Sequence, residues 1–229
     1  MMAIQKFRRP TAPVSLGAFL IAFFWALSAR AEPPYCSLDQ FKKAEIKSPV
    51  SGLKRVHVFQ LGETVLAGLA IGQSNAKSVS ELSGSFSSAG VQNDYCTWYV
   101  NSGNSEAEKR FVHHLLPHPM TVSPSTVADT YLSTMHDSFE LDAPSFQSCI
   151  VQNHYLAIGC NGMMHRGPTV FGMLLAYSGC SAEHAENIVD AIWGLNGVDR
   201  AVRLSIISRA FDLGNANPES QRAVARALE

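Results

Sequence analysis

Apolar and polar residues follow their most informative pattern between residues 148 and 193, which predicts half of a small α+β core. Two β-rich runs lie on either side of Asn153-His154, and the apolar run at residues 170–177 predicts a third strand. After Ser181, an amphipathic helix is predicted by apolar residues at Ala185, Ile188, Val189, Ile192 and Trp193. We therefore expect these strands to form a sheet face on which the helix packs.

The clearest short-range signal is a β-hairpin around Gly62. Residues 56–61 alternate between polar and apolar, Gly62-Glu63 suits a two-residue turn, and residues 64–71 return as an apolar strand. Because the returning strand is apolar on both faces, we expect it to lie inside the sheet with cover on each side.

The remaining elements follow from caps and periodicity. Ser37 begins a capping-box pattern that predicts a short helix, and residues 95–100 have strand propensity. Helices are predicted at residues 123–139, 199–213 and 218–228. The sequence thus predicts an α+β fold with a mostly antiparallel sheet, helices packed on one face, and a C-terminal helical pair within residues 198–229.

The N-terminus resembles a secretory signal peptide in its charge and hydropathy. A basic start with Arg8 and Arg9 precedes an apolar run at residues 14–27, and Ala29-Arg30-Ala31 is a small-residue cleavage site. The alternative is an uncleaved anchor, but this run is shorter than the ~20 residues that a spanning helix needs. We expect cleavage between Ala31 and Glu32, which would leave residues 32–229 as one exported domain in the periplasm or outside the cell.

Charge narrows the class of partner. The first 31 residues carry four basic and no acidic side chains, so their removal changes the formal net charge from −1 to −5. Nucleic acids and anionic membranes attract basic surfaces, so neither is expected as a partner. No later segment has the length and apolarity of a membrane span.

Five cysteines enter an oxidising compartment in this scheme, so the fold is expected to be stapled by disulfides. Any one cysteine can remain free, and the other four allow three connectivities, so the pairing stays open. A hairpin near residues 153–156 would favour Cys149 with Cys160, and Cys36 would then pair with Cys96, leaving Cys180.

Soft and imidazole side chains suggest one alternative function, a periplasmic protein that binds copper. Methionine and histidine together suit Cu(I) in an exported protein. The candidate ligands are His113, His114, His118, Met163, Met164 and His165. No pair has a spacing that specifies a metal, and methionines also fill hydrophobic cores.

A thiol-dependent enzyme is the other alternative. An unpaired Cys180 would precede the first turn of the helix after Ser181, where backbone amides lower the pKa of a thiol. His154, His165 or His184 would be the base. The same position equally suits a small buried residue or half of a bridge.

Known signatures of chemistry are otherwise absent from the sequence. It contains no Gly-x-Ser-x-Gly, no Cys-x-x-Cys and no nucleotide-binding glycine loop. This absence favours a binding or accessory protein of the cell envelope, without enzyme activity or a cofactor, that contacts another protein or a small ligand. The last helix would be either a docked tail or the surface that binds the partner.

Overall fold

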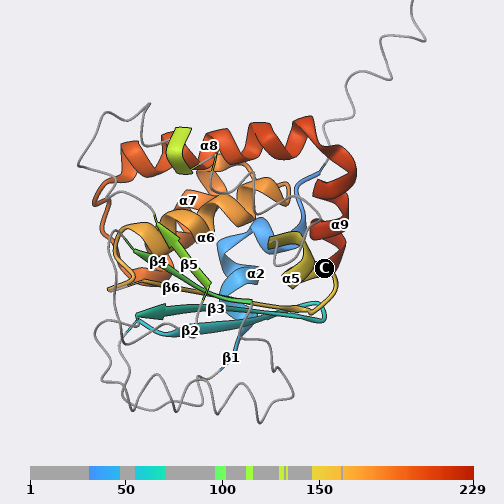
Figure 1. The fold of residues 1–229 in the computed structure, drawn as a ribbon, viewed down its shortest axis with the longest axis horizontal. Helices are drawn as coiled ribbons and strands as arrows, with labels where there is room; N and C mark the ends of the chain where they lie inside the picture. Colours follow the sequence, from blue (N-terminus) through green and yellow to red (C-terminus); the bar gives the residue numbers. More distant parts are fainter. Residues whose placement is uncertain are drawn as a thin grey trace, which may run out of the picture. The chain divides into compact units, whose positions relative to one another are not determined.

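The computed structural model describes residues 31–46, 55–70, 96–101, 112–115, 129–131, 133, 146–160 and 162–229 (Figure 1). Residues 32–229 form one compact unit. Among the described helices, none is long and apolar enough to cross a bilayer. In chain order the elements are η1 (Pro34–Cys36), α2 (Leu38–Lys43), β1 (Glu45–Ile46), β2 (His57–Leu61), β3 (Thr64–Ala70), β4 (Thr97–Asn101), β5 (Val112–Leu115), α5 (Phe146–Val151), β6 (Tyr155–Cys160), α6 (Arg166–Tyr177), α7 (Ala182–Trp193), α8 (Arg200–Ala216) and α9 (Pro218–Leu228).

The predicted α+β class is confirmed, but the sheet is mixed. Its six described strands follow the order β1-β2-β3-β6-β4-β5. The β1–β2 and β2–β3 pairs are antiparallel, whereas β6 pairs in parallel with both β3 and β4, and β4 pairs in parallel with β5. The expectation of a mostly antiparallel sheet is wrong because β6 enters beside β3 after a crossover instead of returning from a hairpin at residues 153–154.

The predicted hairpin at Gly62 is confirmed. His57 pairs with Gly68 and Leu61 pairs with Thr64, and Gly62 has a φ of +52°, a conformation that glycine adopts without steric cost. Strand β3 lies between β2 and β6, and all but one of its residues are buried. It therefore occupies the interior position that its two apolar faces predict.

Two predicted strands are helices. Residues 148–151 belong to α5, and residues 170–177 belong to α6, which begins at Arg166. A short apolar run cannot be assigned to strand or helix by periodicity alone. Residues 167–177 of α6 are all buried, so this helix is apolar all round because it lies between other elements and not at a surface.

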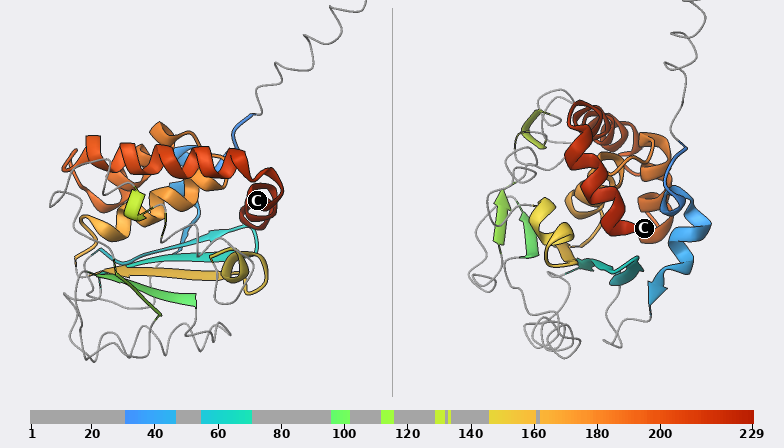
Figure 2. Two further views of the ribbon diagram at one scale, coloured as in Figure 1. Left: turned by 45° about the horizontal axis from the view of Figure 1, so that its top comes forward. Right: turned by 90° about the vertical axis from the view of Figure 1, so that its right-hand side faces the viewer.

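Three helices cover one face of the sheet. Figure 2 shows α6, α7 and α8 on the same side of the strands, with α6 nearest to them. The α7 helix begins at Ser181, whose hydroxyl accepts a hydrogen bond from the backbone N–H of His184, and it ends at Gly194 in a left-handed conformation. The predicted N-cap therefore sets the start of this helix, whereas its end, expected at Gly197, comes three residues earlier at Gly194.

Aromatic side chains join the helices to the sheet. Phe41 of α2 lies 4.4 Å from Phe59 of β2, measured between ring centroids. Phe171 of α6 lies 5.0 Å from Trp193 of α7 and 6.0 Å from Phe59. Each buried ring contributes roughly 1.5–3 kcal/mol of transfer free energy, so this cluster is a main attachment of the helical layer.

The predicted C-terminal helical pair is confirmed, and its last helix is docked. Gln221, Val224 and Leu228 of α9 are buried, and the hydroxyl of Thr64 donates to the carbonyl of Ala227 at 2.6 Å. Of the two interpretations of this helix, the structure supports the docked tail. The predicted helix at residues 123–139 is described only at residues 129–131 and 133, which are helical.

Both disulfides differ from the predicted pairs. Cys36 bonds to Cys180 and Cys96 bonds to Cys149, which leaves Cys160 as the free cysteine in place of Cys180. The predicted Cys149–Cys160 bridge fails because no hairpin joins these residues. Cys149 lies on α5, before β6 begins at Tyr155. Cys160 is the last residue of β6, about 17 Å from the first residue of this strand. A disulfide requires Cα atoms within about 7 Å.

Candidate functional site at Cys160

The predicted metal ligands lie in separate places. His113 and His114 are on β5, in register with Tyr99 and Val100 of β4, and His118 lies outside the described residues. Met163, Met164 and His165 follow β6. Within the described ranges, no group of three or more His, Cys, Asp or Glu side chains could hold a metal.

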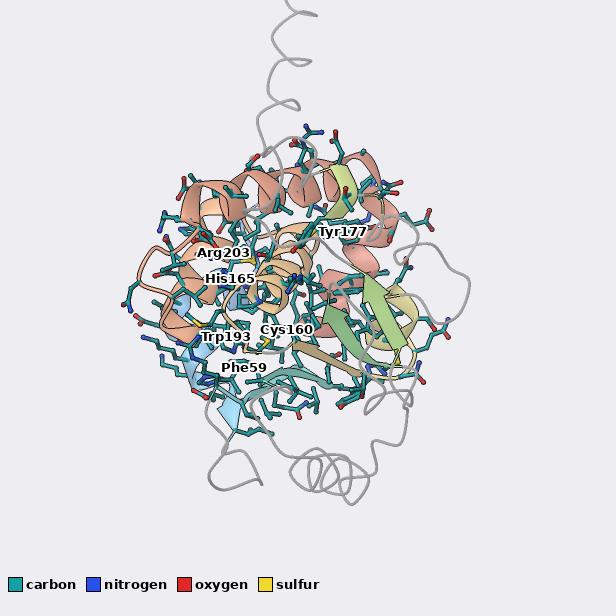
Figure 3. The ribbon with its side chains drawn as sticks, turned by 60° about the vertical axis from the view of Figure 1, so that its left-hand side comes forward. Phe59, Cys160, His165, Tyr177, Trp193 and Arg203 are labelled. Carbon is teal, nitrogen blue, oxygen red and sulfur yellow. A yellow bond between two sulfur atoms is a disulfide. The ribbon has the colours of Figure 1, made fainter. Side chains whose placement is uncertain are left out.

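Cys180 cannot serve as the predicted nucleophile, because its sulfur is bonded to Cys36. The free thiol belongs to Cys160, the last residue of β6, and it is buried with 4% of the residue exposed. Five residues separate Cys160 from Arg166, the first residue of α6. We call residues 160–167 the thiol loop; Figure 3 labels Cys160 and His165 within it.

A backbone N–H group of the thiol loop is hydrogen-bonded to the sulfur. The N–H of Met163 donates to Cys160 Sγ at 3.1 Å. The N-terminus of α6, which begins at Arg166, adds a dipole that favours negative charge. Burial raises the pKa of the Cys160 thiol, and the neighbouring backbone N–H groups of residues 162–167 oppose that rise without cancelling it.

The loop keeps this shape through Met163 and Gly167. Met163 has a φ of +47°, uncommon for a residue with a side chain, and its Sδ lies 3.7 Å from Cys160 Sγ. A Cβ on Gly167 would lie 2.2 Å from Met163 Sδ and 3.0 Å from Cys160 Sγ. Only glycine at residue 167 allows the helix to begin this close to the sulfur.

A cation and a phenol lie within electrostatic range of the thiol. Burial raises the pKa of Tyr131, the positive charge of Arg166 lowers it, and Cys160 raises it. Arg166 and Cys160 are thus both within electrostatic range of the Tyr131 hydroxyl. Arg166 is the first residue of α6 and is partly exposed.

A histidine–carboxylate pair adjoins the same loop. His165 precedes α6, and its Nδ1 lies 2.5 Å from Asp199 Oδ2, in the connection between α7 and α8. The carbonyl of His165 accepts hydrogen bonds from the hydroxyl and the N–H of Thr169. The ring and the backbone of His165 are thus both held.

An open cleft of about 750 Å³ lies away from the thiol loop, between residues 32–38 and the start of α7. Glu32, at the predicted cleavage site beside Ala31, accepts the N–H of Ser181 at 2.9 Å and pairs with His184. Burial raises the pKa of Glu32, but these hydrogen bonds outweigh that effect and hold the pKa below its usual range. Its carboxylate thus helps to cap α7, which gives this cleft a structural role.

Sequence reasoning missed the thiol loop. The signal was present as Cys160-x-Gly-x-x-x-Arg166, but its meaning depends on a strand before the cysteine and a helix beginning at the arginine. The sequence analysis placed Cys160 in a disulfide and residues 170–177 in a strand, so neither condition was recognised. Comparison with protein-family models, curated proteins and solved structures finds no match for this chain.

Proposed function

We propose that this protein is a thiol-dependent enzyme that hydrolyses phosphate monoesters, with Cys160 as its nucleophile. The supporting observation is the position of the one free thiol, at the end of a central strand and before the start of a helix, where it accepts the backbone N–H of Met163 at 3.1 Å. This hydrogen bond and the helix N-terminus favour the thiolate, the reactive form of cysteine, and oppose the burial that raises the pKa of the thiol.

The substrate class follows from charge and shape. Arg166 supplies a planar fork of donors that matches two phosphate oxygens, and loop N–H groups beside a helix N-terminus suit the remaining negative charge. A neutral acyl substrate would leave this positive potential without a partner. An anionic ester is therefore the substrate that the neighbourhood of Cys160 favours.

The proposed hydrolysis needs no co-substrate other than water. The thiolate of Cys160 attacks phosphorus, the S–P bond forms as the ester P–O bond breaks, and the leaving alcohol takes up the proton that the thiol lost. Water then attacks phosphorus, the S–P bond breaks, and inorganic phosphate leaves while the thiol regains its proton. His165, which belongs to the thiol loop and is oriented by Asp199, is the group that we assign to carry that proton.

We further propose that the chain is exported to the periplasm or the medium after cleavage before Glu32. Two disulfides and the lack of a spanning helix among the described residues fit such a location. Mass spectrometry of the protein from its native compartment should find a chain that begins near Glu32. Recovery of the intact chain from the cytosol with reduced cysteines would contradict export.

The binding or accessory role and the copper role stay predictions. Because one face of α9 is buried against the domain, that face is not available to a partner, and the loops are left for that role. For copper, the described residues bring together only two soft sulfur atoms, those of Cys160 and Met163.

The enzyme proposal is tested with the exported form, its disulfides intact, and p-nitrophenyl phosphate. Hydrolysis is followed as released nitrophenolate between about pH 5 and pH 10 in the presence of EDTA, which removes contaminating metal phosphatases. We expect Cys160→Ser to abolish turnover and Arg166→Lys to reduce it about tenfold or more, since lysine lacks the bidentate fork.

His184→Ala is the matched control, because it removes a histidine at the opposite end of α6 from the thiol loop. Its activity should equal that of the unmodified chain. Turnover that survives Cys160→Ser, or no turnover by the unmodified protein at any pH in that range, would refute the proposal.

A further inference from the structure

The connection between α7 and α8 is held in an unusual backbone conformation. Gly194, Asn196, Gly197 and Asp199 all have positive φ, at 59°, 53°, 74° and 57°. For Asn196 and Asp199, which carry side chains, this conformation is strained, and it persists only where the surroundings impose it.

Buried charges impose that conformation. Arg203 pairs with Glu186 through two hydrogen bonds of 2.6 and 2.7 Å, with both side chains at most 1% exposed. The remaining Nη1 of Arg203 donates to the carbonyl of Val198 at 2.8 Å, next to Asp199. Asp190 accepts the N–H of Gly197 at 2.9 Å. The connection is therefore attached to both helices along its length.

The connection between α7 and α8 carries one functional group that contacts the thiol loop, the carboxylate of Asp199. The side chain of Asp199 is 9% exposed, and its carboxylate meets Nδ1 of His165, in the middle of the thiol loop. In the chain, His165 follows Met163 by two residues, and the N–H of Met163 donates to Cys160 Sγ. Figure 3 labels His165, Cys160 and Arg203 in this part of the molecule.

We infer that Asp199 is a positioning residue for the thiol loop: by holding His165, it keeps the backbone N–H of Met163 aimed at the sulfur of Cys160 and Arg166 at the substrate. The inference rests on the proposed function. The buried Glu186–Arg203 pair fixes the connection from which Asp199 acts, at the cost of backbone strain at Asp199 itself.

Asp199→Gly separates this role from a general role in folding. Glycine accepts a φ of +57° without strain, so this variant relieves the backbone while it removes the carboxylate. We expect an unfolding midpoint no lower than that of the unmodified protein. We also expect a kcat for p-nitrophenyl phosphate that falls about tenfold or more, with little change in KM, as the loss of a charge-assisted hydrogen bond predicts.

Alkylation of Cys160 by iodoacetamide provides a readout that does not depend on turnover. A loop released from Asp199 should expose the buried thiol, and labelling should accelerate about tenfold. Asp199→Asn is the conservative variant, because its amide oxygen still accepts the proton of Nδ1; it should restore labelling and kcat to within about threefold of the original. His184→Ala should leave both quantities unchanged.

The outcomes distinguish the two hypotheses. If Asp199→Gly matches the unmodified protein in labelling rate, positioning by Asp199 is wrong, whatever the enzyme assay shows. If Asp199→Asn behaves like Asp199→Gly, the charge of the carboxylate and not its hold on His165 is decisive, and the inference fails. If labelling responds as expected but the unmodified protein has no phosphatase activity, positioning stands and the proposed reaction falls.

Discussion

The buried Glu186–Arg203 pair allows a quantitative prediction about stability. Its two hydrogen bonds are short and bidentate, and neither side chain is more than 1% exposed. Replacing Glu186 by Gln keeps the shape of the side chain but removes the bidentate counter-charge of Arg203 and leaves only Asp190, at 3.4 Å and partly exposed, as a carboxylate partner. Removal of one partner from such a pair costs about 3–5 kcal/mol of unfolding free energy.

The exposed pair between the same two helix segments is the matched control. Arg200 and Glu183 are 41% and 62% exposed and 3.0 Å apart, so Arg200→Ala should cost about 0–1 kcal/mol. Both pairs join a glutamate of α7 to an arginine of α8, and they differ chiefly in burial. The expected ratio of the two losses is therefore at least about threefold.

Equilibrium unfolding in guanidinium chloride, with the disulfides intact, measures both losses, provided that fluorescence and circular dichroism give the same transition. A double variant, Glu186→Leu with Arg203→Met, removes both charges and should recover most of the loss, because well-packed apolar replacements of a buried pair are close to neutral. A loss below about 1 kcal/mol for Glu186→Gln would refute this account of the pair.

Three further predictions concern the disulfide bonds, the pH dependence of stability and the last helix, α9. The Cys36–Cys180 bridge spans 144 residues, so its removal by Cys36→Ser with Cys180→Ser should lower the unfolding free energy by about 2–5 kcal/mol. Chemical unfolding that finds no loss of unfolding free energy would contradict this prediction. Stability should fall above about pH 9–10, because burial raises the pKa of Tyr35 and the unfolded chain then binds fewer protons than the folded one. Tyr35→Phe should reduce the slope of unfolding free energy against pH, and a slope that stays unchanged would exclude this residue as the cause. Deletion of residues 218–229 should lower the melting temperature by several degrees or prevent folding, since three α9 side chains are buried; a stable truncated domain would restore α9 as a free binding surface.

Signals that act over a few residues were sufficient for much of the fold. Gly62 specified its hairpin because a tight turn requires positive φ, and Ser181 specified the start of α7 because its hydroxyl caps the helix. Residues 170–177 gave no such signal. Their continuous apolar character fits both a buried strand and a buried helix, and only contact with the sheet and with α7 and α8 decides for the helix.

The sequence by itself determined the α+β class, the hairpin, the C-terminal helices and the expectation of disulfides, because turns, caps and periodicity are local properties of the chain. The tertiary structure decided which cysteines meet. It also decided that Cys160 stays free and accepts the N–H of Met163, and that Asp199 reaches His165 from 34 residues away. These features depend on distances between residues far apart in the chain, which are set by the packing of α6 between the sheet and α8.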